Sequence, residues 1–326
     1  MPSLIKSIIN ENVFGKTVLI RADLNIPMSD GKVLDQTRVE RITPTINFLK
    51  SSGAKIVICS HLGRPNGKYN KSYTLKPLVK TLSKILETKV LFSNSCLGQE
   101  ALDIKTSLKS SEILLLENVR LHEEETKNSF NFAKKLSEGC DIFVNDAFSC
   151  SHRAHSSLHA ITNFLPSYSG VLLDEEIKAL TSVLSFPIKP VAALVGGAKI
   201  STKINIIEFL ITKMDYLIIG GAMANTFLVA EGLDVGKSLF EKDAVNIAKS
   251  ILNKSKNLNC KIILPIDVVV SKSFEANGNT KIVSSDMIPL DMMALDVGPK
   301  TIKKISFIFE NIKTLLWNGP LGAFEL

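Results

Sequence analysis

Cysteine is scarce in this sequence and is not arranged in pairs. The five cysteines are odd in number, and none stands in a C-x-x-C spacing. Disulfide-stabilised secreted domains and structural zinc sites both depend on paired cysteines. We therefore expect reduced thiols in a cytoplasmic protein, and neither a disulfide framework nor a zinc site.

Other absences exclude further classes of protein. No apolar run approaches the roughly 20 residues of a membrane helix, and residues 1–16 contain no apolar core of signal-peptide length. The net charge of +7 is not gathered into a dense Lys/Arg run, and aromatic residues make up only 6% of the chain. We therefore expect neither a membrane nor a nucleic acid as partner. No G-x-G-x-x-G occurs, which makes an NAD-linked dehydrogenase the least favoured alternative.

Arginine is confined to the first half of the chain. Residues 1–170 contain 22 Lys and Arg against 16 Asp and Glu, and they include every arginine: Arg21, Arg38, Arg41, Arg64, Arg120 and Arg153. A guanidinium group binds phosphates and carboxylates through a planar fork, whereas lysine acts as a point charge. This distribution favours a small, highly anionic ligand in the first half. The alternative is a Lys-rich chain whose few arginines fall there by chance.

Strand-like apolar runs alternate with helical apolar spacing along the whole chain. This alternation predicts parallel sheets covered by helices on both faces. The expected strands are 17–21, 55–60, 112–116, 141–145, 191–195, 215–219, 261–264 and 314–317; the expected helices are 37–51, 74–86, 201–212, 222–231, 243–252 and 300–311. We predict an α/β fold with two Rossmann-like doubly wound domains, residues 1–170 and 187–326, joined by a hinge helix over 171–186.

The segment 191–203, VAALVGGAKISTK, combines a buried strand with paired glycines and two lysines. Glycines at a strand end let a ligand approach the backbone. A helix from Ser201 would offer unpaired N–H groups to an anion, with Lys199 and Lys203 on one face. The segment predicts a phosphate site. The alternative is an ordinary strand-to-helix turn with two solvated lysines.

Ligands of parallel α/β sheets bind beyond the carboxyl ends of the strands. The segments that follow the expected strands are RADLN, SHLGRP, LENVR and VNDAFSCSHRAHSS in the first half, and GGAK, GGAM, LPID and WNGP in the second. A basic pocket and a glycine-lined pocket indicate two substrates. Phosphoryl transfer is the expected reaction class, because its catalysis consists mostly of positioning and charge neutralisation.

Two polar clusters near these segments have simpler interpretations. His152, His155 and His159 lack an H-E-x-x-H pattern, so anion binding or capping is favoured over a metal site. The run His122-Glu123-Glu124-Glu125 is interpreted as a solvated helix start.

Eight motifs in order resemble those of the phosphoglycerate kinase family: RADLNIP, SHLGRP, LLLENVR, VNDAFSCSHRAH, VGGAKISTKI, IIGGAMANTF, ALDVGP and LWNGPLGAFE. The resemblance covers essentially the whole chain. It implies a glycolytic kinase that transfers the acyl phosphate of 1,3-bisphosphoglycerate to Mg-ADP, giving 3-phosphoglycerate and ATP. It also implies Mg²⁺ carried with the nucleotide, hinge bending and a monomer. Among the residues of this chain we expect no metal ligand.

The resemblance assigns site residues motif by motif. Its catalytic residues are Arg38, Lys199 and Lys203. The positions that match the family's phosphoglycerate contacts are Asp23, Asn25, Arg38, His61, Leu62, Gly63, Arg64, Arg120 and Arg153. The positions that match its nucleotide contacts are Gly197, Lys199, Lys203, Gly220, Gly221, Asn318, Pro320 and Glu325.

The sequence departs from the family's pattern at its end. The family continues with a Gly-Gly-Gly-Asp turn whose aspartate holds the Mg ion, and no G-G-x-D occurs here. We therefore expect the second domain to be incomplete and turnover to be reduced. The alternative to an active kinase is a truncated, non-catalytic relative that only binds phosphoglycerate.

Overall fold

The computed structural model describes residues 5–29, 31–68, 70–275 and 278–324. The chain divides into two compact units, Met1–Ala179 and Leu180–Leu326. Helix α6 (Val171–Ser185) carries the chain across this boundary, which lies between the predicted domain limits at 170 and 187. Within the described ranges, no helix is both long and apolar enough to cross a bilayer.

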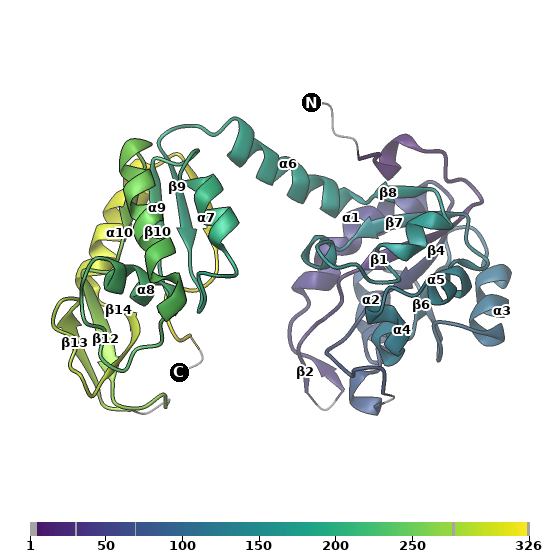
Figure 1. Cartoon of the computed structure of the whole chain (residues 1–326). Helices are drawn as coiled ribbons and strands as arrows, with labels where there is room; N and C mark the ends of the chain where they lie inside the picture. Colours follow the sequence, from purple (N-terminus) through teal and green to yellow (C-terminus); the bar gives the residue numbers. More distant parts are fainter. Residues whose placement is uncertain (1–4, 30, 69, 276–277, 325–326) are drawn as a thin grey trace. The chain divides into compact units, whose positions relative to one another are not determined.

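The first unit is built on a six-stranded parallel sheet with the order β5-β6-β4-β1-β7-β8 (Figure 1). Its strands are β1 (Thr17–Ala22), β4 (Lys55–Cys59), β5 (Val90–Ser93), β6 (Ile113–Leu116), β7 (Ile142–Asp146) and β8 (Ser167–Ser169). Its helices are α1 (Thr37–Ser51), α2 (Leu78–Ile85), α3 (Gln99–Ser107), α4 (Glu123–Thr126) and α5 (Phe130–Ser137), and a short antiparallel pair is formed by β2 (Met28–Ser29) and β3 (Lys32–Val33).

Strand β1 shows why these strands lack polar alternation. Val18 and Ile20 pack into one hydrophobic core on the α1 and α2 side, whereas Leu19 packs into a second core on the α3 and α5 side. A central strand of a parallel sheet is covered on both faces, so apolar residues follow one another without polar alternation. Six consecutive residues of β1 are buried, including the charged Arg21.

The second unit has a four-stranded parallel sheet with the order β11-β10-β9-β15. Its strands are β9 (Val191–Val195), β10 (Tyr216–Ile219), β11 (Lys261–Ile263) and β15 (Thr314–Asn318). Its helices are α7 (Ile204–Leu210), α8 (Ala222–Ala230), α9 (Val245–Asn257) and α10 (Pro299–Asn311). A separate antiparallel sheet is formed by β12 (Asp267–Ser271), β13 (Thr280–Ser284) and β14 (Met293–Val297).

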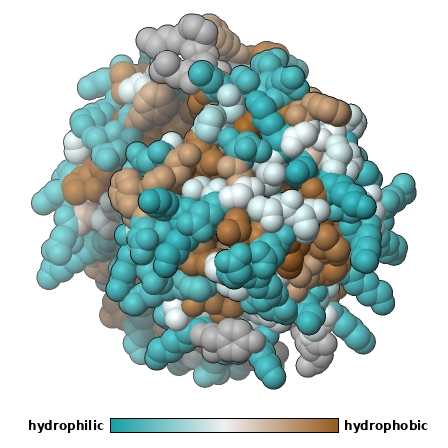
Figure 2. All heavy atoms as spheres, turned by 90° about the vertical axis from the view of Figure 1, so that its right-hand side faces the viewer, coloured by the Kyte–Doolittle hydropathy of each residue, from teal (hydrophilic) through white to brown (hydrophobic). Residues whose placement is uncertain are grey.

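Short 3₁₀ helices connect these elements. They are η1 (Ile8–Asn10), η2 (Lys71–Tyr73), η3 (Val119–Leu121), η4 (Phe148–Cys150), η5 (Ala160–Asn163) and η6 (Lys242–Ala244). Figure 2 shows one face of the molecule, on which hydrophilic side chains are interspersed with groups of apolar ones.

The α/β fold with parallel sheets is confirmed, and all eight expected strands are present within about one residue at each end. Three helices begin later than predicted: α2, α7 and, by two residues, α9. Helix α2 starts at Leu78 because the Thr74 hydroxyl and the Leu75 N–H donate to the Glu117 carboxylate, at 2.5 and 2.8 Å, which holds this segment out of the helix. The antiparallel sheet was not predicted, because the mostly exposed β13 has little apolar signal.

Asp146 links the sheet of the first unit to helix α6. Its side chain is fully buried, and Oδ1 accepts the N–H of Leu173 at 3.0 Å. Among the described residues, Oδ2 has no hydrogen-bond partner. Burial raises the pKa of Asp146 to about 6. A Cβ on Gly170 would lie 2.2 Å from Oδ1, so this approach of the helix requires glycine.

We expect Asp146→Asn to stabilise the protein in a pH-dependent way. Because the folded-state pKa is raised, folded Asp146 keeps a proton between about pH 4 and 6 that the unfolded chain has released, so stability falls as pH rises through this window. The variant escapes this loss and should gain roughly 1–3 kcal/mol in free energy of unfolding at pH 7.5, but little at pH 4. Urea denaturation at both values measures the gain; an equal change at both would contradict the assignment.

Candidate active site

The basic segments of the first unit meet at one edge of its sheet. Strands β6, β4, β1 and β7 are consecutive neighbours, and all of them run parallel. Their carboxyl ends therefore bring together the loops that begin at Glu117, Ser60, Asp23 and Ala147. This arrangement collects the predicted phosphoglycerate-side residues of all four motifs.

Three arginines line one pocket at this edge. Arg64, Arg120 and Arg153 surround a cavity of about 250 Å³ together with Asn66, Thr126 and His155. Arg120 is 5% exposed, and its Nη1 donates to the Gly63 carbonyl at 2.9 Å. Its loop is fixed because the Asn118 side chain accepts the Arg120 N–H at 2.9 Å. The pocket has the size and charge to hold a phosphate group.

Asp23 and Arg38 form an ion pair in a second part of the site. Arg38, from the first turn of α1, makes an ion pair with Asp23, and Ser149 also donates to this carboxylate. Burial alone would raise the pKa of Asp23, but the hydrogen bonds from Ser149 and the Asn25 N–H, with the charge of Arg38, hold that pKa below its usual value. These groups border a pocket of about 200 Å³ that also contacts Asp146 and Ser149.

Asn25, Leu62 and Gly63 shape the backbone between these two parts. The Asn25 Oδ1 accepts the N–H of Gly63 at 2.8 Å, and the carbonyl of Leu62 accepts from Asn118 Nδ2 at 2.9 Å. The Leu62 side chain is 6% exposed. The predicted substrate residues of this loop are thus held together.

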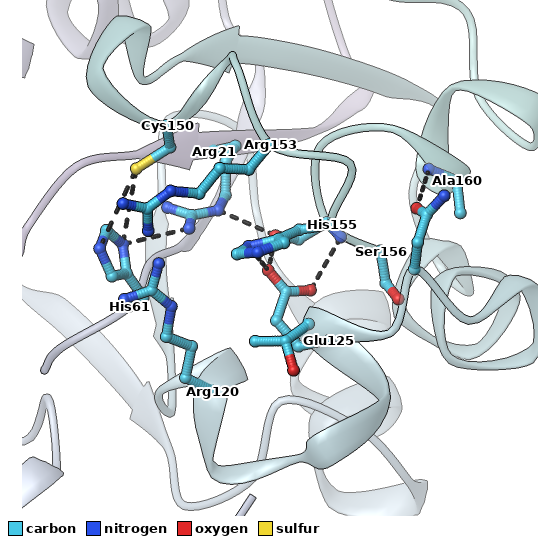
Figure 3. Close-up of polar contacts among 12 residues, drawn as sticks. Arg21, His61, Arg120, Glu125, Cys150, Arg153, His155, Ser156 and Ala160 are labelled. Atoms are coloured by element: carbon cyan, nitrogen blue, oxygen red, sulfur yellow. Dashed lines mark hydrogen bonds and ion pairs between the residues drawn. The ribbon is translucent and has the colours of Figure 1, made fainter. Parts of the chain in front are cut away.

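His61 lies behind the arginines and is buried. It is 3% exposed, and Nη2 of Arg21 lies 3.1 Å from its Nδ1. Burial and the charges of Arg21 and Arg120 lower the pKa of His61 to about 2, so its ring is neutral at physiological pH. Figure 3 shows Arg21, Arg120 and Arg153 gathered around this ring.

One group of possible metal ligands lies here. In the described part of the chain, Asp23, His61 and Cys150 are the one set of three whose ligand atoms all lie within 4.8 Å of one another. Arg38 pairs with the aspartate and Arg21 contacts the histidine ring, so two cations already hold these groups. This positive surrounding favours an anion over a metal ion.

The structure corrects one expectation about the acidic run Glu123–Glu125, with which helix α4 begins. The helix does begin at Glu123, but Glu125 is fully buried and is not solvated. Its carboxylate accepts both the N–H and the hydroxyl of Ser157, at 2.9 and 2.6 Å, and lies 3.7 Å from His155 Nδ1. No local pattern in the sequence indicates this burial, because the hydrogen-bond partner is 32 residues away.

The glycine-rich segments of the second unit also meet at one sheet edge. Strands β10, β9 and β15 are neighbours, and their loops contact one another. The Met223 N–H donates to the Gly197 carbonyl at 2.9 Å, and the Gly221 N–H donates to the Leu321 carbonyl at 2.6 Å. Gly220 N–H donates back to Val195 at 3.0 Å.

The two lysines of this unit do not share a helix face as predicted. Helix α7 begins only at Ile204, because the Ser201 N–H and hydroxyl bond to Glu241 at 3.0 and 2.6 Å. Lys199 therefore lies in the loop with an exposed side chain. Lys203 precedes the helix, and its Nζ donates to the Gly196 carbonyl and to Asn318 Oδ1, at 2.7 and 2.5 Å.

An apolar pocket of about 320 Å³ opens beside these glycines. It is lined by Gly197, Gly221, Leu239, Phe274, Met293, Leu295, Pro320 and Phe324, among others. Such a lining suits the flat faces of an aromatic base. Of the predicted residues, Gly197, Gly221 and Pro320 line it, whereas Lys203 and Asn318 bond behind it. Glu325 lies outside the described residues.

Some residues of both sites could not have been found from the motifs alone. Leu239, Phe274 and Met293 come from distant segments: Met293 belongs to β14 of the unpredicted antiparallel sheet, and Phe274 lies between β12 and β13. Ser149 and Ser157 lie within a predicted motif or next to it, but serine carries no signal of its own. The roles that the sequence assigned to the site residues remain predictions.

Comparison with known proteins decides between the reaction classes. The family model described as phosphoglycerate kinase matches residues 8–326. The chain belongs to the phosphoglycerate kinase family. Phosphoglycerate kinase of Methylorubrum extorquens is 50% identical over 312 residues, which cover 96% of this chain and 78% of that protein.

Solved structures of phosphoglycerate kinases agree with this membership. That from Coxiella burnetii superimposes with a TM-score of 0.81 at 38% identity, covering 98% of this chain and 81% of that chain. That from Pyrococcus horikoshii OT3 gives 0.84 at 32% identity, covering 98% and 82%. The two-domain Rossmann-like fold is therefore that of the family.

We expect Gly221→Ala to destabilise the second unit more than a matched control. A Cβ on Gly221 would lie 2.6 Å from the Gly197 carbonyl oxygen, whereas a Cβ on Gly232 would meet no atom within 4 Å. Both glycines have positive φ, 68° and 91°, so backbone strain is shared. The difference should be roughly 1–3 kcal/mol in stability. Thermal unfolding of both variants measures it; equal losses would contradict the close approach.

Proposed function

We propose that this phosphoglycerate kinase transfers a phosphoryl group between the carboxylate of 3-phosphoglycerate and the terminal phosphate of Mg-ATP. In the ATP-consuming direction, a carboxylate oxygen forms a bond to the γ-phosphorus while the bond from that phosphorus to the bridging oxygen of ADP breaks. The products are 1,3-bisphosphoglycerate and Mg-ADP. The observation that supports this most directly is the family match over residues 8–326. No feature of the described residues favours the alternative of a non-catalytic phosphoglycerate-binding relative.

The first unit is proposed to hold phosphoglycerate. Arg64, Arg120 and Arg153 would bind its phosphate group through the pocket that they line. Arg38, held by Asp23, would lie toward the reacting carboxylate, because its guanidinium is 44% exposed while the aspartate is 15% exposed. Asn25, Gly63 and Leu62 would support this pocket through the bonds described above, and the buried His61 would support it through its contact with Arg21.

The second unit is proposed to hold the nucleotide. The apolar pocket beside Gly221 would take the base, while Gly197 and the exposed Lys199 would meet the phosphates. Lys203 ties the loop after β9 to Asn318, and burial lowers the pKa of Lys203. Pro320 would contribute backbone to this pocket. We keep Gly220, which is not among the lining residues, and Glu325 as proposed nucleotide contacts. Mg²⁺ would arrive with the nucleotide as part of the substrate.

The chemistry requires positioning and charge neutralisation. Negative charge spreads over the equatorial oxygens of the transferred group, and Arg38 and Lys199 would neutralise it. Water must be excluded, because it would compete for the phosphoryl group. We therefore propose that transfer needs the two units to close together, with α6 as the connecting hinge.

The cellular compartment and the oligomeric state of the enzyme are also proposals. Cys59, Cys96, Cys140, Cys150 and Cys260 form no disulfide in the described structure. Reduced thiols of this kind are typical of the cytoplasm. We propose a cytoplasmic monomer acting in glycolysis.

Arg38→Ala tests this function. We expect the variant to lose at least about 100-fold in kcat, because a cation at the reacting centre is removed. Its affinity for ADP should change less than about twofold. Coupled assay with ATP and 3-phosphoglycerate gives the first quantity, and calorimetric titration with Mg-ADP gives the second.

Arg41→Ala is the matched control on the same helix. Arg41 lines the same pocket as Arg38 but makes no ion pair with Asp23. It is 52% exposed and approaches Glu175 and Glu176 only at 3.8 and 3.7 Å, so its removal should lower kcat much less than the removal of Arg38. Loss of ADP affinity in Arg38→Ala, or equal losses in both variants, would refute the role proposed for Arg38. Failure of the unmodified protein to turn over these substrates would refute the function itself.

A further inference from the structure

The buried carboxylate of Glu125 has no part in the site as described so far. It lies beneath the arginine pocket on helix α4 and is fully buried. Burying a carboxylate is costly unless hydrogen bonds and opposite charges compensate for the lost water. Both of its oxygens accept hydrogen bonds from Ser157, at 2.6 and 2.9 Å. A group kept at such a cost calls for a reason in the surroundings.

Ser157 connects Glu125 to Arg21 through two hydrogen bonds. The Ser157 hydroxyl donates to Glu125 Oε1, so its oxygen is free to accept the Nε–H of Arg21 at 2.9 Å. Arg21 is itself fully buried, and its Nη1 donates to the Ala22 carbonyl at 2.5 Å. The direction of each hydrogen bond from Arg21 through Ser157 to Glu125 is fixed, because the carboxylate can only accept and the guanidinium can only donate.

Arg21 in turn fixes the protonation of His61. Nη2 of Arg21 lies 3.1 Å from His61 Nδ1. Since arginine is always a donor, Nδ1 must accept, and the single proton of the neutral ring must sit on Nε2. The hydrogen-bond chain Glu125–Ser157–Arg21–His61 therefore sets one tautomer and one ring orientation in the middle of the arginine cluster. Figure 3 shows Glu125, Arg21 and His61 of this chain.

Glu125 also supplies negative charge where positive charges crowd. Arg21, Arg120 and Arg153 all act on His155, whose Nδ1 lies 3.7 Å from Glu125 Oε1. Burial lowers the pKa of His155, and the Glu125 charge opposes this shift. Arg120 Nε is buried without a hydrogen-bond partner among the described residues. The guanidinium groups thus stand close together before any substrate phosphate is present.

We propose that Glu125 is a positioning residue for phosphoglycerate: through Ser157 and Arg21 it fixes the tautomer of His61, and as a buried counter-charge it holds the arginine cluster assembled. The inference rests on the proposed function, since it concerns the binding of that substrate. It assigns Glu125 no contact with the substrate and no part in nucleotide binding.

Glu125→Gln tests this role with almost no change in shape. We expect the KM for 3-phosphoglycerate to rise at least about tenfold, because each 1.4 kcal/mol of lost preorganisation is a factor of ten. The KM for ATP should stay within about twofold. Ring ¹⁵N chemical shifts of His61 should change from a single Nε2–H tautomer to a mixture. Glu124→Gln is the matched control, because this neighbouring glutamate is exposed on the same helix.

The outcomes separate positioning from simple structural support. A folded Glu125→Gln protein with unchanged KM for 3-phosphoglycerate and an unchanged His61 tautomer would overturn the proposal. Parallel losses for both substrates would also overturn it, since they indicate general destabilisation. If the variant does not fold, Ser157→Ala carries the same two readouts, because it breaks the chain and leaves the carboxylate in place.

The tautomer measurement also keeps this inference separate from the proposed function. If the unmodified protein does not turn over ATP and 3-phosphoglycerate, the proposed function fails. The ¹⁵N shifts of His61 still report whether Glu125 controls the ring. Loss of the Nε2–H tautomer in Glu125→Gln but not in Glu124→Gln supports the positioning chain in either case.

Discussion

The first unit must hold several guanidinium groups close together, and much of its local structure compensates for the repulsion between them. Like charges repel, and the repulsion is stronger where water is excluded. The protein separates the cations by giving each an acceptor of its own: Arg38 pairs with Asp23, Arg120 bonds the Gly63 carbonyl, and Arg21 bonds Ser157 and Ala22. A phosphate bound at the proposed site would meet cations that are already oriented, so little binding free energy would be lost in ordering them.

The sheet makes this arrangement possible. Four neighbouring parallel strands end at one edge, so four loops from distant parts of the sequence converge within hydrogen-bond reach. The strands themselves are buried on both faces, which leaves the loop ends as the place where polar groups can meet solvent and ligand. Even Arg21, although inside a strand, turns its guanidinium toward this edge, where it contacts His61. Rigid strands thus position side chains that loops alone would leave mobile.

The sequence was a good guide to this framework and a poor guide to the charges beneath it. Strand positions follow from apolar runs such as Val191–Val195, because burial on both faces leaves a clear local pattern. Helix starts were predicted less well: Ser201 and Leu75 bond to Glu241 and Glu117, which are 40 and 42 residues away. The sequence also predicts a solvated Glu125, because its hydrogen-bond partner Ser157 is 32 residues away. Such pairings depend on the folded topology, and no local pattern records them.

The two proposed phosphate sites differ, and the difference follows from the substrate proposed for each unit. Phosphoglycerate is small and carries much charge, so its proposed site concentrates arginines that need buried acceptors. A nucleotide brings a large apolar base, so its proposed site needs open space beside the backbone: Gly221 lies so close to Gly197 that no side chain fits between them. The proposed nucleotide site therefore needs few cations to hold its ligand. Lys203 donates hydrogen bonds to the Gly196 carbonyl and to Asn318 Oδ1 and so links these two segments. The confinement of arginine to the first unit would therefore follow from the different ligands proposed for the two units.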